Sequence, residues 1–258
     1  MLDARDLIEE RLSNALGIIF DLDGTLVHGV HALPGAAALV SALSCPFVIA
    51  SNNSSETAET LSNKLNKMGF LLDPSQLILA GEMALDEVAR RFDGAEVMLI
   101  ASQELHQKAK ALGIRIVAHG GDVVLVCRDE RFDYGVLKAA SNSLRHGATL
   151  IAANPDLSHP GASGCLIPET GSLVAAILAV SGTIDIEIIG KPQSLMLRQA
   201  LGRMGIPADS ALLIGDNPAT DGRGAFEMNI PFLQLGGTAS TSVGSPVDLL
   251  RAVRTMTK

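Results

Sequence analysis

The sequence predicts an α/β protein built on doubly wound parallel sheets. Short apolar runs alternate along the chain with longer segments in which apolar residues recur at helical spacing. Hydrophobic residues make up 47% of the chain but aromatic residues only 3%. Such aliphatic strands are typical of parallel sheets that helices cover on both faces. Strand–helix alternation of this kind favours right-handed crossovers on each sheet.

The predicted elements follow from the apolar patterns in chain order. Seven short apolar runs predict buried strands, at residues 17–20, 46–50, 96–100, 122–126, 148–152, 186–189 and 211–214. Helical spacing predicts helices over residues 57–68, 82–92 and 134–145.

The spacing between polar motifs predicts two domains. Asp23 and Ser51 are 28 residues apart, which is room for one helix and one strand. Ser51 and Lys191 are 140 residues apart, which exceeds the need of a core whose βα repeats take roughly 30 residues each. We expect a core from residues 1–79 and 184–258 and an inserted α/β domain at residues 80–183.

Composition and charge exclude several function classes. The net charge of −8 would repel a nucleic-acid backbone, and the low aromatic content disfavours base stacking. The longest apolar stretch, residues 172–180, is too short to span a bilayer. Three widely separated cysteines indicate no disulfide framework. We expect a cytoplasmic protein without nucleic-acid or membrane partners, with a homodimer left open.

Four polar clusters come directly after predicted strands. They are Asp21 to Thr25, Ser51 to Ser54, Gly190 to Pro192 and Gly215 to Asn217. In open α/β sheets the ligand crevice lies beyond the carboxyl ends of the strands. The four clusters are therefore expected to converge on one site.

Asp21 and Asp23 are the first candidate pair. In extended chain, Leu22 can point to the core while both carboxylates face the crevice. Two neighbouring carboxylates repel each other unless a cation compensates, and Mg²⁺ suits an incomplete protein shell completed by phosphate oxygens. The structural alternative is a strand end with two solvated acids.

The other clusters supply groups that suit a phosphate ester. Ser51 and Asn52 offer hydrogen-bond donors, Lys191 offers a point charge, and Asp216 can bind metal. Asp221 can orient Lys191. Each residue has a structural alternative: Ser51 as a helix cap, Lys191 as surface charge and Asp216 as a turn residue.

Taken together, DLDGT, SNNS, GKP and GDNPATD resemble the four motifs of the haloacid dehalogenase (HAD) superfamily. Three further features are similar to the nitrophenylphosphatase-like branch. They are the asparagine pair Asn52-Asn53 that follows Ser51, the segment Asn154-Pro155-Asp156 and the PETGSL segment at residues 168–173. The resemblance implies a Rossmann-like core with a smaller α/β cap domain, inserted after the second motif, that sets substrate specificity.

The resemblance also implies a role for each motif residue. Asp21 would attack phosphorus, and Asp23 would protonate the leaving oxygen and later activate water. Mg²⁺ would be held by Asp21, by the backbone carbonyl of Asp23 and by Asp216.

The remaining motif residues would bind the phosphoryl group or support that binding. Ser51, Asn52 and Lys191 would bind it, and Asp221 would support Lys191 or the metal. The chain departs from the pattern in having Ser51 where threonine is usual, and Glu169 where glycine is common, which leaves the local turn open. Gly222-Arg223-Gly224 also replaces a more usual apolar residue.

The candidate specificity loop is residues 154–164, whose proline and glycine content predicts a non-helical turn. Within it, His159 precedes a proline, and a similar His-Pro occurs in the corresponding loop of some pyridoxal phosphate phosphatases. The alternative is a surface histidine in a turn.

The predicted function is that of a magnesium-dependent phosphatase acting through an aspartyl-phosphate. Its substrate would be a small phosphate monoester: a sugar phosphate, phosphoglycolate, a nucleotide or pyridoxal phosphate. One alternative is a phosphotransferase or mutase on the same site. In the family that the motifs resemble, however, mutase caps are usually inserted after the first motif, where the 28 residues between Asp23 and Ser51 leave no room for a domain. The other is a non-enzymatic protein that binds phosphometabolites.

Overall fold

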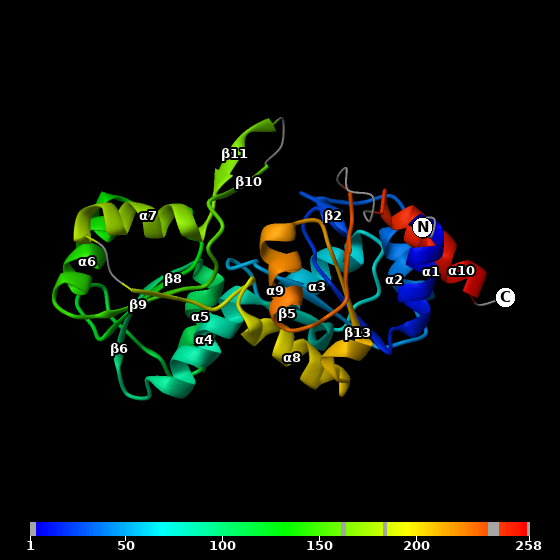
Figure 1. The fold of residues 1–258 in the computed structure, drawn as a ribbon. Coiled ribbons are helices and arrows are strands. Elements are labelled where there is room, and N and C mark those ends of the chain that lie inside the picture. The colour runs from blue at the N-terminus through cyan, green and yellow to red at the C-terminus, as the bar shows by residue number, and fades with distance from the viewer. Residues whose placement is uncertain (1–3, 161–163, 183–184, 237–242, 257–258) are drawn as a thin grey trace. The chain divides into compact units, whose positions relative to one another are not determined.

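The computed structural model describes residues 4–160, 164–182, 185–236 and 243–256 of the 258-residue chain. The chain forms two compact units. The first unit comprises Met1–Ser51, Ala58–Ile78 and Lys191–Lys258, and the second comprises Asn52–Thr57 and Leu79–Gly190. Each is organised around its own five-stranded sheet (Figure 1).

The sheet of the first unit has the order β14-β13-β1-β4-β5. Its central pairs, β1 with β13 and β1 with β4, are parallel. The strands are β1 (Gly17–Phe20), β4 (Phe47–Ser51), β5 (Leu77–Leu79), β13 (Ala211–Gly215) and β14 (Phe232–Gln234).

Helices cover the first sheet. Helix α2 packs against α10, which also packs against α1, while α8 packs against β4 and α9. The α-helices are α1 (Ala4–Asn14), α2 (Ala36–Ala42), α3 (Ala58–Lys67), α8 (Ser194–Met204), α9 (Arg223–Glu227) and α10 (Pro246–Met256). Shorter elements are the hairpin β2 (Val27–His28) and β3 (His31–Ala32) and the single turns η1 (Pro74–Gln76), η3 (Ala208–Ser210) and η4 (Pro218–Gly222).

The sheet of the second unit has the order β12-β9-β8-β6-β7 and is parallel throughout. Helices α6 and α7 lie along one face, and α4 and α5 along the other (Figure 1). The elements are α4 (Ala80–Arg91), β6 (Glu96–Ile100), α5 (Gln103–Ala111), β7 (Arg115–Ile116), β8 (Val123–Val126), α6 (Tyr134–Arg145), β9 (Thr149–Ala152), α7 (Thr170–Ser181) and β12 (Ile186–Ile188). A separate antiparallel hairpin joins β10 (Ser158–Pro160) to β11 (Leu166–Pro168).

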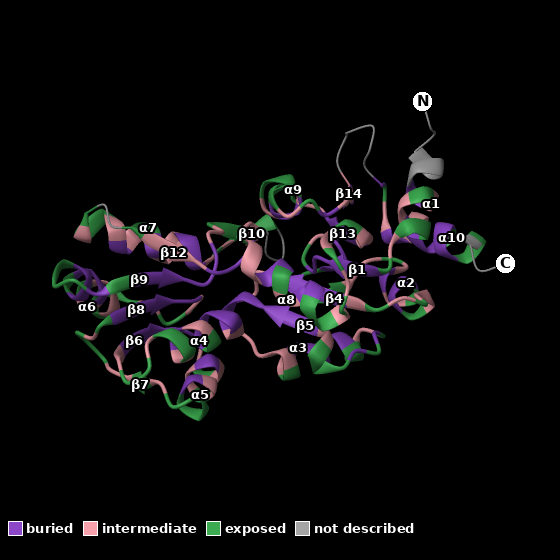
Figure 2. Ribbon diagram, turned by 60° about the horizontal axis from the view of Figure 1, so that its bottom comes forward, coloured by how far each residue is buried: buried purple, intermediate pink, exposed green. Residues whose placement is uncertain are grey.

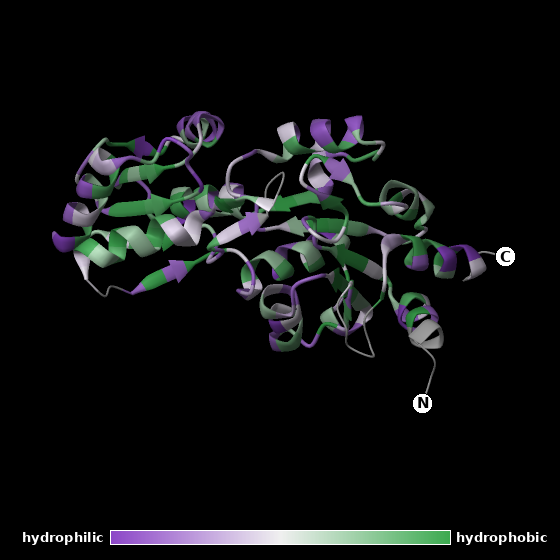
Figure 3. Ribbon diagram, turned by 90° about the horizontal axis from the view of Figure 1, so that it is seen from above, coloured by the Kyte–Doolittle hydropathy of each residue, from purple (hydrophilic) through white to green (hydrophobic). Residues whose placement is uncertain are grey.

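Burial of aliphatic strands explains why these segments fold as they do. Strands β1, β8 and β13 are buried along their whole length, as Figure 2 shows. The hydropathy view in Figure 3 shows mainly apolar strands in both sheets. Two helices of the second unit begin at a polar side chain that caps them: Ser102 accepts a hydrogen bond from the Leu105 N–H, and Asp133 from the Val136 N–H. The doubly wound α/β fold class is therefore confirmed.

The predicted strands are confirmed to within one residue at each end. The predicted domain boundaries differ from the compact units at three places, one of which is Leu79, which belongs to the second unit. Residues 185–190 belong with the second unit, because β12 pairs with β9. Residues Asn52–Thr57 also belong there. The predicted boundary between residues 183 and 184 lies outside the described residues.

Two expectations from composition can be compared with the structure. None of the helices in the described ranges is long and apolar enough to cross a membrane. None of the three cysteines, all of which lie in the described residues, forms a disulfide; Cys127 is buried and Cys165 is exposed.

Candidate active site

The central strand of the first sheet ends at a topological switch point. The chain leaves β1 for β4 on one side, and β13 later joins β1 on the other. Asp21 follows β1 directly, and its backbone N–H donates to the carbonyl of Ile214 in β13 at 2.8 Å. Asp216 follows β13 directly. Because ligands bind beyond the carboxyl ends of strands at such a point, these two residues mark the candidate site.

A buried ion-pair network occupies this position. The Lys191 Nζ donates to Asp21 Oδ1 at 2.5 Å and to Asp221 Oδ1 at 2.6 Å. Asp21, Lys191 and Asp221 are 8%, 2% and 1% exposed. An ammonium group held between two carboxylates in the protein interior has a fixed position, so the network orients Asp21.

The loop after β1 adds two further constraints. The Thr25 hydroxyl donates to Asp21 Oδ2 at 3.1 Å, so both carboxylate oxygens of Asp21 are engaged. Gly24 has a φ of 83°, and a Cβ placed there would lie 2.1 Å from Asp216 Oδ2. A side chain at residue 24 would therefore displace Asp216. No role was predicted for Thr25, although its position in DLDGT, four residues after Asp21, was the available signal.

Asp221 is held by the turn that follows β13. Its backbone N–H donates to the Asn217 carbonyl at 2.9 Å, and its Oδ2 accepts from the Asn217 N–H at 3.3 Å. A Cβ on Gly215 would lie 2.4 Å from Asp221 Oδ2, so this carboxylate packs directly on the strand end. Local sequence thus fixes Asp221 opposite Lys191.

Burial and charge perturb the acid–base behaviour of this cluster. Burial works to lower the pKa of Lys191, but Asp21 and Asp221 outweigh it and the pKa is raised. Burial raises the pKa of Asp221, with Lys191 opposing. The pKa of Asp216 is raised to about 6, first by burial and then by the charge of Asp21. When ionised, the carboxylates of this region therefore carry more negative charge than the positive charge of Lys191 can balance.

The donor set fits a hard divalent cation. One oxygen from each of Asp21, Asp216 and Asp221 lies within 4.8 Å of the others. Oxygen-only ligand sets suit Mg²⁺, and a divalent cation would offset the repulsion that raises the pKa of Asp216. These three residues could hold a metal ion. Asp221, which the sequence analysis expected in a supporting role, is the third carboxylate of this group.

The structure places the other predicted site residues as follows. Ser51 ends β4, next to β1 in the sheet, and is 2% exposed. Asp23 lies two residues beyond Asp21 and is exposed. Asn52 belongs to the second unit, where its side-chain amide donates to Asp156 Oδ2 at 2.9 Å.

His159 lies on β10 rather than in an irregular turn. The predicted turn at residues 154–164 includes that strand, and residues 161–163 lie outside the described residues. The His159 Nδ1 is 2.7 Å from Glu169 Oε1. Glu169 itself has an extended backbone, with a φ of −113°, which any residue adopts. Its presence in place of glycine therefore does not strain the turn.

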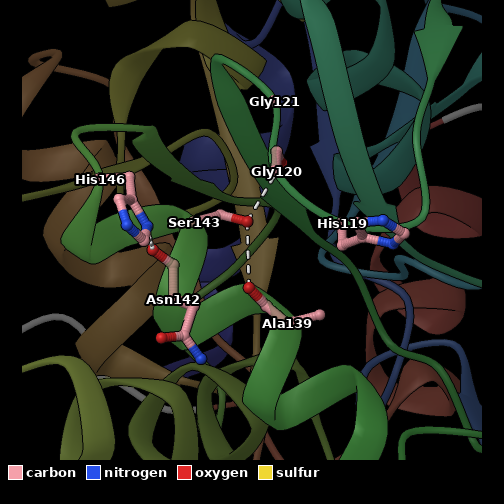
Figure 4. Close-up of a pocket in the computed structure, with 7 residues that line it drawn as sticks. All are labelled: His119, Gly120, Gly121, Ala139, Asn142, Ser143 and His146. Atoms are coloured by element: carbon pink, nitrogen blue, oxygen red, sulfur yellow. Dashed lines mark hydrogen bonds between the residues drawn. The ribbon is translucent and has the colours of Figure 1, made fainter.

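A separate pocket of about 370 Å³ lies in the second unit, between α6 and the loop before β8. Figure 4 shows Ser143 in its wall, with its hydroxyl bonded to the carbonyls of Gly120 and Ala139. Among the described residues, the lining contains none of the predicted site residues. The candidate chemistry is therefore in the first unit, at the switch point.

Comparison with protein families agrees with this geometry. Residues 18–115 match the model of the haloacid dehalogenase-like hydrolases, and residues 188–243 match a second model described as HAD-hydrolase-like. The two matches together span more than half of the chain and include Asp21, Ser51, Lys191 and Asp216.

The chain belongs to the haloacid dehalogenase-like hydrolases. Within them it falls in the nitrophenylphosphatase subfamily, as the sequence predicted. Among curated relatives, it is 29% identical over 208 residues to a 5'-nucleotidase of Bacillus subtilis, covering 80% of both chains. It is also 29% identical over 207 residues to an acid sugar phosphatase of Staphylococcus aureus, covering 79% of both.

Solved structures show the same relationship. The 4-nitrophenylphosphatase of Thermotoga maritima matches with a TM-score of 0.84 and 28% identity, over 94% of this chain and 99% of that one. A glycerol phosphate phosphatase of Mycobacterium tuberculosis, in complex with magnesium, matches with a TM-score of 0.83 and 25% identity, over 98% and 80%. At the level of reaction class, this HAD hydrolase is a phosphomonoesterase that acts on small phosphate monoesters.

Proposed function

We propose that this HAD hydrolase is a magnesium-dependent phosphatase in which Asp21 forms an aspartyl-phosphate. The observation that carries the proposal is the position of Asp21. This carboxylate is buried at the switch point, accepts hydrogen bonds from both Lys191 and Thr25, and lies beside Asp216. A fixed carboxylate beside a cation is suited to in-line attack on phosphorus.

In the first step, an Asp21 oxygen attacks phosphorus and the bond from phosphorus to the leaving oxygen breaks. Asp23 donates a proton to that oxygen, which releases the alcohol. Lys191, and the Ser51 hydroxyl at the end of β4, bind the phosphoryl oxygens. This step depends on charge neutralisation, which the buried ammonium of Lys191 supplies.

In the second step, water attacks the phosphorus of the aspartyl-phosphate. Asp23 accepts a proton from the water, and the bond between phosphorus and Asp21 breaks, which releases inorganic phosphate and restores both acids. The exposure of Asp23 suits proton exchange with solvent between the two steps.

We propose Mg²⁺ as the cofactor, held by Asp21, Asp216 and the backbone carbonyl of Asp23. Asp221 supports Lys191 and lies close enough to support the metal. When bound, Mg²⁺ would neutralise phosphoryl charge that three carboxylates would otherwise repel. A magnesium-bound relative of this fold supports the choice of metal.

The substrate is proposed to be a small phosphorylated metabolite, and the second unit is proposed to act as its specificity domain. The relatives named above are a 5'-nucleotidase, an acid sugar phosphatase and a glycerol phosphate phosphatase. Phosphoglycolate and pyridoxal phosphate remain in the candidate set from the sequence. We assign His159 to contact the part of the substrate beyond the phosphate, and Asn52 to the phosphoryl end.

Transfer to an alcohol acceptor is the second candidate activity. The same aspartyl-phosphate can pass its phosphoryl group to a hydroxyl in place of water. The non-enzymatic alternative is disfavoured because Asp21, Asp23 and Lys191 are all present.

The test is hydrolysis of p-nitrophenyl phosphate by the purified protein with Mg²⁺. We expect Asp21→Asn to lower turnover by roughly 10⁴-fold or more, as deletion of a nucleophile does. The matched control is Asp209→Asn, an exposed acid in the same unit, which should retain full turnover. Wild-type turnover by Asp21→Asn would remove the nucleophile assignment.

Two further measurements separate the remaining alternatives. Excess chelator should stop turnover and added Mg²⁺ should restore it; full activity in chelator would exclude the metal. With glycerol as a competing acceptor, inorganic phosphate should remain the product. Stoichiometric formation of glycerol phosphate would identify a phosphotransferase.

A further inference from the structure

A second cluster of charged side chains lies in the second unit, around Glu169. Its carboxylate is 2.7 Å from His159 Nδ1 and 3.6 Å from Arg128 Nη1. Arg128 lies two residues after β8, His159 lies on β10, and Glu169 immediately precedes α7. Three elements of one unit thus converge on this carboxylate. We call these three residues the Glu169 cluster.

The cluster fixes which nitrogen of His159 carries the proton. A carboxylate at 2.7 Å accepts a hydrogen bond, so Nδ1 must donate. In the neutral ring, Nε2 is then the acceptor. The His159 side chain is 37% exposed, whereas that of Glu169 is 14% exposed. Among the described residues, Nε2 has no hydrogen-bond partner. The ring is therefore anchored on its buried side and accessible on the other.

The charges around His159 disfavour a negatively charged ligand. Arg128 is shared between Glu169 and Glu130, whose carboxylate lies 2.7 Å from Arg128 Nη2. Asp156 adds another negative charge near Glu169. With these carboxylates ionised, the single positive charge of Arg128 against the three negative charges of Glu130, Glu169 and Asp156 (+1 − 3) leaves a net charge of −2 around the ring. A group that hydrogen-bonds here is favoured if it is an uncharged donor.

We propose that Glu169 is a positioning residue for substrate selection, which holds His159 so that Nε2 accepts a hydrogen bond from a hydroxyl of the leaving group. The substrate class is then the phosphate monoester of an uncharged polyol or sugar, in preference to one with a carboxylate. This inference rests on the proposed function, because it takes His159 as a substrate contact.

Two substitutions at Glu169 separate orientation from charge. Glu169→Ala removes the acceptor for Nδ1. Glu169→Gln keeps an acceptor oxygen but removes the negative charge. The matched control is Glu130→Gln, which alters the exposed partner of Arg128 and does not touch His159. The probes are glycerol 3-phosphate, phosphoglycolate and p-nitrophenyl phosphate.

We expect wild-type protein to prefer glycerol 3-phosphate to phosphoglycolate in kcat/KM. Glu169→Ala should raise the KM for glycerol 3-phosphate by roughly 10-fold, the effect of one lost hydrogen bond, with kcat on p-nitrophenyl phosphate unchanged. Glu169→Gln should keep the KM for glycerol 3-phosphate within about 2-fold of wild type and should raise kcat/KM for phosphoglycolate. Glu130→Gln should leave the ranking as in wild type.

A double substitution tests whether Glu169 acts through His159. Glu169→Ala in a His159→Ala background should add nothing to the KM for glycerol 3-phosphate, because the group it positions is gone. Independent, additive losses would overturn the positioning role. So would equal losses by Glu169→Ala on all three probes, or identical rankings for the alanine and glutamine variants.

The outcomes also separate this inference from the proposed function. Unchanged substrate ranking with normal p-nitrophenyl phosphate turnover overturns the role of Glu169 alone. Wild-type protein that hydrolyses none of the three probes overturns the proposed function, and this inference with it. If Glu169→Ala does not fold, the comparison of Glu169→Gln with His159→Gln decides, since only the second should weaken binding of glycerol 3-phosphate.

Discussion

Each of the two sheets of this protein has a switch point beside its first strand, but the sheets differ in strand order and in what lies at that point. In the first, β1 lies between β4 and β13; in the second, β6 lies between β7 and β8. Buried charges follow the strands of the first sheet. The corresponding ends of the second sheet are covered by the chain's own segment, Asn52–Thr57.

Hydrogen bonds from both backbone and side-chain groups hold that segment in place. The Ser102 hydroxyl, just after β6, donates to the Ser55 carbonyl at 2.6 Å. The Arg128 N–H, just after β8, donates to the Ser54 hydroxyl at 3.1 Å. The Thr57 N–H donates to the Glu104 carboxylate at 2.8 Å. The first switch point is therefore a candidate reactive site where buried charges stay incompletely balanced, whereas the second is a scaffold where polar groups are satisfied.

The largest expected effect comes from removing the buried charge of the first switch point. Lys191→Met would leave Asp21 and Asp221 without their ammonium partner, and breaking a buried ion pair costs about 3–5 kcal/mol. We expect a decrease of that size in the free energy of unfolding, measured by urea denaturation, together with loss of turnover.

Lys108→Met is the control in the second unit. Lys108 pairs with Glu82 at 3.1 Å but keeps 35% of its side chain exposed, so its loss should cost about 1 kcal/mol or less. Equal effects at Lys191 and Lys108 would contradict the distinction between the two sheets.

A smaller effect is expected at Gly24. Gly24→Ala combines a positive φ with displacement of Asp216 and should cost at least about 2 kcal/mol. Gly29→Ala shares the positive φ but meets open space, so about 1 kcal/mol is expected. Thermal unfolding gives both values. The Mg²⁺ concentration for half-maximal turnover should rise for Gly24→Ala alone. An equal rise for Gly29→Ala would show that the effect of Gly24→Ala is not specific to the metal site.

The smallest effect is expected at the second switch point. Ser102→Ala removes the cap of α5 and the hydrogen bond to Ser55, which should lower the free energy of unfolding by about 1 kcal/mol. Because Ser102 has no proposed role in catalysis, kcat on p-nitrophenyl phosphate should stay within about 2-fold of wild type. A much larger loss of kcat would show that this switch point contributes to catalysis.

The sequence predicted the elements with strong local signals. Runs of four or five aliphatic residues gave the central strands, since burial on both sheet faces leaves little else compatible with them. Strands β5 and β14 were not predicted, although β12, which also has three residues, was. The hairpin of β10 and β11 was missed because its proline and glycine content predicts a turn, whereas pairing between distant residues forms the strands.

The sequence predicted those residues of the candidate site that directly follow a predictable strand. The rule for parallel sheets brought Asp21, Lys191 and Asp216 together although 170 residues separate the first two. It could not show that Thr25 turns back to Asp21, or that the Asn52 amide bonds to Asp156, because both depend on side-chain direction. The Glu169–His159 contact likewise depends on how β10 and α7 meet.

The allocation of Asn52–Thr57 to the second unit has a consequence for how this protein could be divided or recombined. The backbone passes between the units four times, after Ser51, Thr57, Ile78 and Gly190. A fragment excised at residues 79–190 would leave the hexapeptide behind and expose the N–H of Arg128 and the hydroxyl of Thr170, which Ser54 now satisfies. Exchange of the insert between relatives would therefore require the hexapeptide to be transplanted with it.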